Sequence, residues 1–383
     1  MCSFTSAQSP VPVGAKLEKI ASGFQQAEGP LWVDGLGLLF SDIKANKIYN
    51  WNEKDSISIF MNPSDSSNGL TLDKQGRLVL TQMEIRSVSR RENDGTITVL
   101  ASTYNGKRFN SPNDVVVKSD GAIFFTDPPF NIPSGQHQEL PYSGIYRISP
   151  FGAIQILDSS LALPNGICFS PDEKKLYVND SQVRIIYQWD VVNDSTLANK
   201  RRIASIPITG YADGMKVDSS GNIYSAGPTG IWVFSPAGTQ LDKIAVPDQP
   251  SNCNWGDADR KTLYITTGTN VYRIRMAATT GVNEGKGAVN KLFELYANYP
   301  NPFNPSTLIS WMLVKSGNVK LKIYDSLGNE VTTLVDEFQN AGSHSITFNA
   351  LTSAGNKQLS SGVYFYELIL NENSLVKKMM VLK

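Results

Sequence analysis

The chain has 383 residues, a length that suits two domains, and its 41% hydrophobic and 18% charged residues are ordinary for a folded protein. Lysine plus arginine and aspartate plus glutamate both number 35, so the formal net charge is zero and nothing favours nucleic acid as a partner. No apolar run approaches the roughly 20 residues that a membrane-spanning helix needs, and the cysteines are too few and too scattered for a disulfide framework.

Residues 1–15 are polar and contain proline, and we expect them to be flexible. They have neither the basic start nor the apolar stretch of a signal peptide, so we expect no intact signal peptide in this chain. The role of Cys2 stays open, and one interpretation is that it is the remnant of a lipid-attachment cysteine. Cys168 and Cys253 are expected to be buried free thiols, because free cysteine is among the most buried residue types.

Six segments between residues 28 and 267 share one layout, in which a short apolar strand, a polar turn and a second apolar strand follow one another. Further strand-like runs lie between these pairs. Four strands per repeat, at a period of about 40 to 50 residues, are typical of the blades of a β-propeller. The sequence therefore predicts an all-β, six-bladed propeller over residues 16–276. The second strands are anchored at Leu38, Leu78, Ile123, Leu176, Ile223 and Leu263.

Two segments depart from the repeat. Lys16–Phe24 precedes the first repeat and resembles a lone strand, so we predict that it completes the last blade and closes the ring. Pro128–Ser143 is the longest interruption, and we expect a loop on one face of the propeller. His137 in this loop is expected to be exposed to solvent.

Each repeat carries a side-chain oxygen ten or eleven positions before its second-strand anchor. The first strand of a propeller blade lines the central channel, so these residues would form a ring of oxygens at the channel mouth. Such oxygens suit Ca²⁺, whose charge two carboxylates would neutralise. Alternatively they are turn residues at strand starts, an interpretation favoured for Asn68 and Asn252 but not for Glu28. The six positions are Glu28, Asn68, Asn113, Asn165, Asp213 and Asn252.

Five motifs in this order resemble the gluconolactonase/regucalcin (senescence marker protein) family, and the resemblance extends from Lys16 to Met276. It implies a six-bladed propeller with one divalent metal in its channel, Ca²⁺ first, with Zn²⁺ and Mn²⁺ as alternatives. The motifs are EGPLW at 28–32, SPNDVVV at 111–117, FTDP at 125–128, LPNGICFSPD at 163–172 and ADGMKVD at 212–218.

The resemblance also implies roles for individual residues. Glu28, Asn165 and Asp213 would bind the metal. Asp213 would in addition be the general base, and Asn113 would contact the substrate close to the metal.

Two further candidates are weaker. Arg108 lies near, but not at, the position of an arginine that assists substrate binding in animal members of the family. Asp127 ends a second strand, and it is an additional ligand, a residue that supports a ligand, or a turn residue.

The implied reaction is the opening of a sugar lactone, in which the metal polarises the carbonyl while Asp213 assists the attack of water. A serine triad is not expected, because the sequence has no GxSxG motif and only two histidines, His137 and His344. Their number and spacing also exclude a zinc site built on histidine or cysteine. Two alternatives remain: an aryl-ester or organophosphate hydrolase with the same metal, and a non-catalytic binding propeller stabilised by Ca²⁺.

The C-terminal part differs from the repeats. Residues 277–292 are small, polar and contain glycine, which predicts a linker. Six or seven short alternating strands over residues 293–383 predict a small Ig-like β-sandwich. This segment resembles the C-terminal sorting domain of bacterial type IX secretion, through NYPNPFNPST at 298–307, KIYDSLGNEV at 322–331, SGVYFYEL at 361–368 and KKMMVLK at 377–383.

The resemblance of the tail implies a secreted or cell-surface protein that engages the secretion machinery, usually with removal of the tail, and no part for the tail in catalysis. An ordinary carbohydrate-binding or adhesion sandwich is the alternative. A monomer is the expected oligomeric state.

Overall fold

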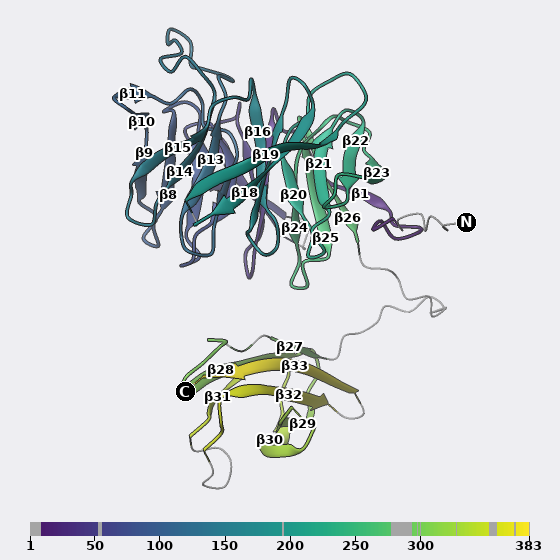
Figure 1. The fold of residues 1–383 in the computed structure, drawn as a ribbon. Coiled ribbons are helices and arrows are strands. Elements are labelled where there is room, and N and C mark those ends of the chain that lie inside the picture. Colours follow the sequence, from purple (N-terminus) through teal and green to yellow (C-terminus); the bar gives the residue numbers. More distant parts are fainter. Residues whose placement is uncertain are drawn as a thin grey trace, which may run out of the picture. The chain divides into compact units, whose positions relative to one another are not determined.

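In the computed structural model, the regular structure of the described residues consists of β-strands (Figure 1), and the chain divides into two compact units, Met1–Thr280 and Gly281–Lys383. The predicted linker 277–292 and Cys2 lie outside the described residues. Within the described part there is no helix long and apolar enough to cross a membrane. The described residues are 9–52, 56–193, 195–276, 293–296, 298, 300–326, 328–351, 358–370 and 373–382.

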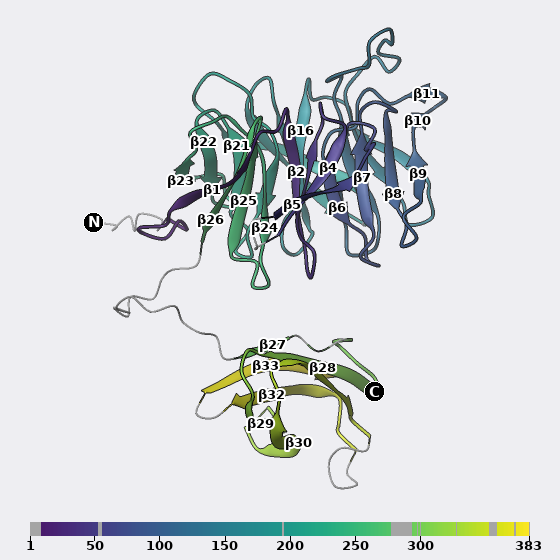
Figure 2. The same ribbon diagram turned by 180° about the vertical axis from the view of Figure 1, so that it is seen from behind.

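The first unit is a propeller of six antiparallel sheets with four strands each, as predicted (Figure 2). The blades, from the innermost strand outward, are as follows. The first is β2 (Ala27–Val33), β3 (Gly37–Asp42), β4 (Lys47–Asn52) and β5 (Ser56–Met61); the second is β6 (Ser67–Leu72), β7 (Leu78–Gln82), β8 (Ser87–Arg91) and β9 (Ile97–Ala101); the third is β12 (Val115–Val117), β13 (Ile123–Asp127), β14 (Gly144–Ile148) and β15 (Ile154–Asp158). The fourth is β16 (Pro164–Phe169), β17 (Lys175–Asp180), β18 (Ile185–Val192) and β19 (Thr196–Ser205); the fifth is β20 (Met215–Val217), β21 (Ile223–Gly227), β22 (Gly230–Phe234) and β23 (Gln240–Ala245); the sixth is β24 (Pro250–Gly256), β25 (Thr262–Thr267), β26 (Asn270–Arg275) and β1 (Leu17–Ser22).

The sixth blade closes the ring with strands from both ends of the unit. β1 pairs antiparallel with β26, with Leu17 opposite Ile274 and Ser22 opposite Asn270, so the prediction for the lone N-terminal strand is confirmed. Each innermost strand also contacts the innermost strand of the next blade all the way round. Closure therefore leaves no gap between the first and the last blade.

The six predicted anchors all lie in second strands, and the Pro128–Ser143 segment connects β13 to β14 without a strand, as expected. A hairpin of β10 (Thr103–Tyr104) and β11 (Lys107–Arg108) was not predicted, because strands of two residues are too short for a hydrophobic pattern. The hairpin lies at the outer edge of the propeller (Figures 1 and 2).

The core of this unit lies between neighbouring blades. The second strands are buried along their whole length in several blades, which explains their continuous apolar sequences. Aromatic rings fill the space between blades: Phe124 meets Phe169 edge to face, and Trp32 stacks on Tyr264 across the closing junction.

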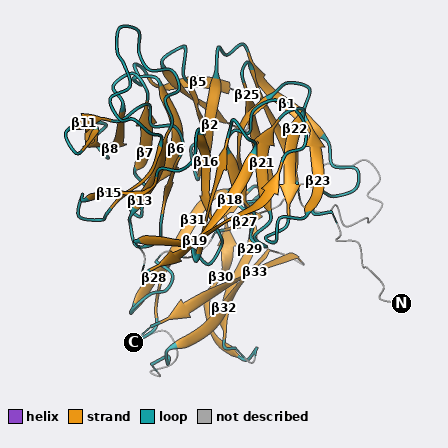
Figure 3. Ribbon diagram, turned by 45° about the horizontal axis from the view of Figure 1, so that its top comes forward, coloured by secondary structure: helices purple, strands orange, loops and turns teal. Residues whose placement is uncertain are grey.

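The second unit is a β-sandwich of two antiparallel sheets, as predicted, and Figure 3 shows its strands and connecting loops. Both sheets contribute to one core, which includes Trp311, Leu321 and Tyr366. One sheet is β27 (Phe293–Leu295), β28 (Ser306–Leu313) and β31 (Gly342–Asn349); the other is β30 (Glu330–Gln339), β29 (Gly317–Tyr324), β32 (Gly362–Leu370) and β33 (Asn373–Val381).

Glycine lets the innermost strands approach one another. Gly29, with φ of +51°, follows Glu28, and a Cβ atom on it would lie 2.1 Å from the backbone oxygen of Asn68 in the next blade. No side chain fits there without moving one blade away from the other. The close approach at the channel mouth therefore depends on this residue.

We expect Gly29→Ala to lower the free energy of unfolding by about 2–5 kcal/mol, because the strain of a left-handed backbone adds to the clash with a rigid backbone oxygen. Gly76→Ala is the matched control. Gly76 also has a positive φ of +75°, but nothing lies within 4 Å of its Cβ position, so strain alone applies, about 1–2 kcal/mol. Urea unfolding followed by tryptophan fluorescence measures both, and equal losses would contradict the close approach.

Candidate active site at the channel mouth

Six polar residues, called the ring below, lie at one end of the innermost strands, one in each blade. Five of them expose 6% or less of their surface, while Asp213 is partly exposed. The second strands β3, β7, β13 and β17 end on this same face, which we call the ring face. The structure thus brings the six predicted positions together: Glu28, Asn68, Asn113, Asn165, Asp213 and Asn252.

Hydrogen bonds between blades hold the backbone of the ring. At four junctions, the next-to-last residue of a second strand donates its side-chain hydrogen to the backbone carbonyl of the ring residue in the following blade. The neighbouring blade therefore fixes where each of these ring residues points. The pairs are Ser41 with Asn68 (2.9 Å), Thr81 with Asn113 (2.6 Å), Thr126 with Asn165 (2.7 Å) and Asn179 with Asp213.

Asp127, the last residue of β13, supports the segment that leads to Asn113. It is fully buried, and its two carboxylate oxygens accept the backbone N–H groups of Asn110 and Ser111, both at 2.8 Å. Burial raises the pKa of Asp127 to about 7, while the two N–H bonds lower it. Both oxygens are engaged by the backbone of its own blade, so Asp127 is placed as a support of that segment.

The electrostatics of the ring are set by two acidic side chains. Burial raises the pKa of Glu28 to about 7, although the Gly29 N–H and the Asn252 amide donate to its Oε2 at 2.9 and 3.2 Å. Burial raises the pKa of Asp213 well above its ordinary value, and the charge of Glu28 raises it further. Two carboxyl groups that interact in this way are both ionised at neutral pH only when a positive charge lies beside them.

Asn165 presents an oxygen atom that nothing in the described residues satisfies. Its Nδ2 donates to Ser181 Oγ at 3.0 Å, while its buried Oδ1 has no hydrogen-bond partner. In the described part of the chain, no group of three or more His, Cys, Asp and Glu side chains is arranged to hold a metal. A cation at the ring would therefore depend on two carboxylates supplemented by amide oxygens, a donor set that hard cations accept.

Two further charged residues lie next to the ring and were not predicted. Lys216 in β20 places its Nζ 3.3 Å from Oδ2 of Asp114, the residue after Asn113. The sequence analysis took only one position from each repeat. A lysine within the otherwise apolar inner strand Met215–Val217 is the signal that points to the pair.

The structure does not bring Arg108 to the ring. Its guanidinium donates to the Ile85 carbonyl at 2.9 Å and to Gln136 Oε1 at 3.0 Å, beside the β10–β11 hairpin. His137 is exposed, as expected, and its carbonyl accepts a bond from the buried Arg86. These residues hold the Pro128–Ser143 loop.

Cys168 and Cys253 are buried and free, which confirms the prediction made for them. Burial raises the pKa of each thiol to about 12, so neither is a reactive thiolate.

A cavity of about 320 Å³ opens on the ring face, a size that suits a small molecule. It lies over residues that immediately precede inner strands or follow second strands. Its polar lining comes from several loops, and Met83 is buried beneath it. The lining includes Gln26, Lys44, Ser66, Met83, Glu84 and Asn131.

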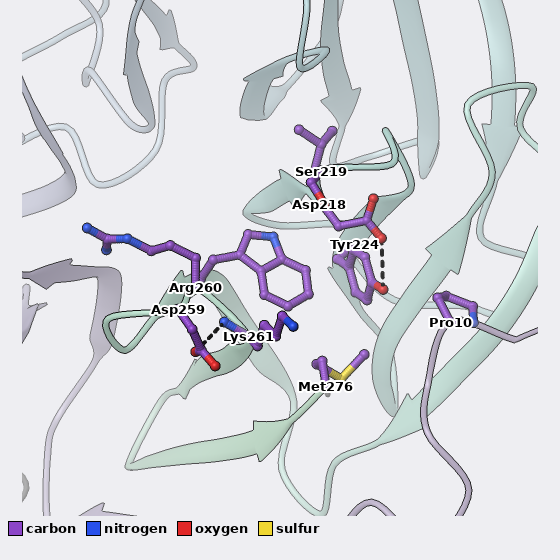
Figure 4. Close-up of a pocket in the computed structure, with 10 residues that line it drawn as sticks. Pro10, Asp218, Ser219, Tyr224, Asp259, Arg260, Lys261 and Met276 are labelled. Atoms are coloured by element: carbon purple, nitrogen blue, oxygen red, sulfur yellow. Dashed lines mark hydrogen bonds between the residues drawn. The ribbon is translucent and has the colours of Figure 1, made fainter. Parts of the chain in front are cut away.

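A second cavity, of about 560 Å³, lies at the opposite ends of the strands (Figure 4). It adjoins Val217, at the end of β20 that is farther from Asp213. Several of its polar side chains form hydrogen bonds with other residues that line the cavity. Asp218 accepts the Tyr224 hydroxyl at 3.3 Å, and Asp259 accepts the Lys261 N–H at 3.1 Å. This cavity is separate from the ring.

Comparisons with known proteins match this architecture. The family model described as SMP-30/Gluconolactonase/LRE-like region matches residues 26–269, which include the whole ring. A second family model, described as secretion system C-terminal sorting domain, matches residues 297–382.

Individual relatives are lactonases. The gluconolactonase of Zymomonas mobilis is 36% identical over 297 residues, covering 69% of this chain and 82% of that protein. Pentonolactonase XacC of Haloferax volcanii is 26% identical, covering 63% of this chain and 80% of that protein. The solved structure of a gluconolactonase from Xanthomonas campestris is 33% identical with a TM-score of 0.66, covering 70% of this chain and 91% of that one.

We expect Asp127→Asn to lower the free energy of unfolding by about 1–3 kcal/mol, because an amide accepts only one of the two N–H groups and turns its own NH₂ toward the other. Urea unfolding measures the loss. Asp120→Asn is the matched control, since its Oδ1 accepts a single backbone N–H, from Ala122 at 2.8 Å, and its ion pair with Lys118 is partly exposed. We expect less than about 1 kcal/mol there, and a similar loss in both variants would contradict the support role.

Proposed function

The chain belongs to the SMP-30/gluconolactonase/LRE-like family, and from this membership we propose that it is a metal-dependent lactonase that hydrolyses a sugar lactone to the hydroxy acid. The observation that carries the proposal is the ring itself. It places the buried carboxylate of Glu28, the partly exposed carboxylate of Asp213 and an unsatisfied amide oxygen at the mouth of a propeller that is 36% identical to a gluconolactonase over 297 residues.

The ring residues suit a divalent cation. Glu28 and Asp213 supply two negative charges when they are ionised, and Asn165 supplies an unsatisfied oxygen. The charge of Glu28 raises the pKa of Asp213, so a bound cation would favour the ionised form of both. We propose that these three residues hold one ion, Ca²⁺ first, with Zn²⁺ or Mn²⁺ as alternatives. When bound, the ion would polarise the lactone carbonyl and stabilise the negative charge that develops on its oxygen.

Asp213 is the proposed general base. It is the ring carboxylate that is partly exposed, so it is the one that can contact a water molecule at the channel mouth. It would accept a proton as the water oxygen bonds to the carbonyl carbon. The same proton then passes to the ring oxygen of the lactone as the ester bond breaks, which gives a carboxylic acid and a hydroxyl group on one product.

Asn113 is proposed to orient the ester by hydrogen bonding. Its backbone oxygen accepts a hydrogen bond from Thr81, and Asp127 holds the residues that precede it. These contacts fix the backbone from which its side chain extends. Arg108 has no place in this proposal, because its guanidinium is engaged away from the ring.

The ring-face cavity supports a hydroxylated substrate over an aryl ester or an organophosphate. Its lining includes a lysine, a glutamate, an asparagine, a glutamine and a serine, all groups that bind hydroxyl oxygens. A sugar lactone offers several hydroxyl groups to such a wall.

We propose further that the second unit serves type IX export to the cell surface or the medium, since residues 297–382 match a secretion system C-terminal sorting domain. The unit has its own hydrophobic core and shares no residue of the ring. We therefore expect it to have no role in the reaction.

Hydrolysis of a panel of sugar lactones, followed by acid release, tests the proposed activity. We expect activity to disappear after chelation and to return when one of Ca²⁺, Zn²⁺ or Mn²⁺ is added. Undiminished activity after chelation would contradict the proposed dependence on a metal. Turnover of aryl esters or organophosphates without turnover of any lactone would transfer the proposal to an esterase on the same ring.

We expect Asp213→Asn to keep the fold and to lower the turnover number by about 10²–10⁴-fold, because the variant loses the proposed base. Asp259→Asn is the matched control, since Asp259 is on the opposite face in an exposed ion pair with Arg275. The control should turn over substrate like the wild type. Normal turnover by Asp213→Asn would refute the assigned base.

A chain that ends at residue 276 should hydrolyse lactones at the rate of the full chain, because the propeller closes without any residue of the second unit. Steady-state kinetics of both proteins, with circular dichroism as the check on folding, test this expectation. A folded truncated protein that had lost most of its activity would show that the tail contributes to the site.

A further inference from the structure

An ion pair between the buried Asp114 and the partly buried Lys216 joins three blades directly beside the ring. Nζ of Lys216 lies 3.3 Å from Oδ2 of Asp114, and the two side chains are 17% and 3% exposed. The ammonium also donates to the carbonyl of Met215 at 3.1 Å, and the backbone N–H of Ile167 donates to the same Asp114 oxygen at 3.4 Å. The third, fourth and fifth blades therefore meet at this pair.

The pair acts electrostatically on the ring. Burial is the main cause of the raised pKa of Glu28, and of the two members of the pair Asp114 raises this pKa while Lys216 lowers it. After burial and the charge of Glu28, Asp114 also raises the pKa of Asp213. Both members therefore lie within electrostatic reach of a ring carboxylate.

Lys216 is a fixed positive charge. Burial by itself lowers the pKa of Lys216, but other groups, of which the Asp114 carboxylate is the largest, raise it above its ordinary value. The side chain is therefore an ammonium ion at neutral pH. When Glu28 and Asp213 are both ionised, as ligands of a cation are, the channel mouth holds three carboxylates and one ammonium, which together carry two net negative charges.

We propose, on the premise of the lactonase site described above, that Lys216 sets the net charge of the channel mouth to the value that one divalent cation neutralises, and so determines how tightly the cation is held. Without Lys216, three negative charges would hold the cation more tightly. Without Asp114, one net negative charge would remain, and the cation would be held more weakly. Lys216 is thus a positioning charge for the cation rather than a group that touches the substrate.

A purely structural role makes a different prediction. If the pair only tied three blades together, removal of either partner would leave a buried unpaired charge and lower the stability in the same direction. The affinity for a cation would then fall, or stay unchanged, in both single variants. Opposite changes in affinity arise only from the sign of the charge that is removed.

Calcium titration by calorimetry, on the full chain freed of metal, measures the affinity directly and without any substrate. We expect Lys216→Met to bind Ca²⁺ about tenfold or more tightly than the wild type, and Asp114→Asn about tenfold or more weakly, because one unit charge is removed close to a divalent ion. The double variant restores the net charge, so its affinity should return to within about threefold of the wild type.

Two controls accompany the titration. Lys216→Arg keeps the charge, and its affinity should stay within about threefold of the wild type. Asp190→Asn removes a carboxylate from an ion pair with Lys175 on the second and third strands of the fourth blade, and it should leave the affinity unchanged. Urea unfolding in chelator confirms that each variant is folded, and if Lys216→Met does not fold, Asp114→Asn and the double variant decide.

The outcomes separate this inference from the proposed function. A wild-type chain that binds no Ca²⁺, Zn²⁺ or Mn²⁺ would overturn the metal-dependent lactonase and this inference with it. Metal binding by the wild type, with affinities that fall together or do not change in the folded variants, would overturn the inference alone and leave the lactonase intact.

Discussion

The candidate site depends on the close approach of six inner strands around one channel. Each inner strand contacts the next, and side chains at the ends of second strands reach across to hold the backbone of the following blade's ring residue. A shift of one blade would therefore displace the ring residue of its neighbour as well as its own. Closure of the sixth blade by β1 is for this reason a condition of the site as much as of the stability of the propeller.

The same closure places acidic groups where burial penalises their charge. Glu28 and Asp213 both have raised pKa values with burial as the main cause, and Asn165 keeps an oxygen without a partner. A propeller selected only for stability would replace these groups by apolar side chains, which pack without a desolvation cost. Buried polar groups that are kept despite this desolvation cost are typical of a site that binds a ligand.

The sequence predicted the blades, their closure and the ring, because each repeats a local pattern at a regular interval. It did not reveal the Lys216–Asp114 pair, since the two residues are 102 positions apart and meet only when the third and fifth blades turn toward one channel. The position of Arg108 could not be predicted from the sequence either, because strands of two residues are too short to carry a hydrophobic pattern. Asp127 was left with three interpretations, and its two backbone partners became visible only in three dimensions.

The positions of the ring residues and of the residues at the rim of the ring-face cavity are held by different parts of the structure. The ring positions belong to the repeat, so strand pairing and the bonds between blades dictate where they lie. The rim is the exposed lining of the ring-face cavity, which includes Lys44, Glu84 and Asn131. These residues follow the second strands of the first three blades, where no strand pairing holds them. Substitutions in the rim therefore disturb few contacts of the core, whereas substitutions in the ring disturb two blades at once. In the proposed lactonase, such a division would let the choice of substrate change while the ring keeps its geometry.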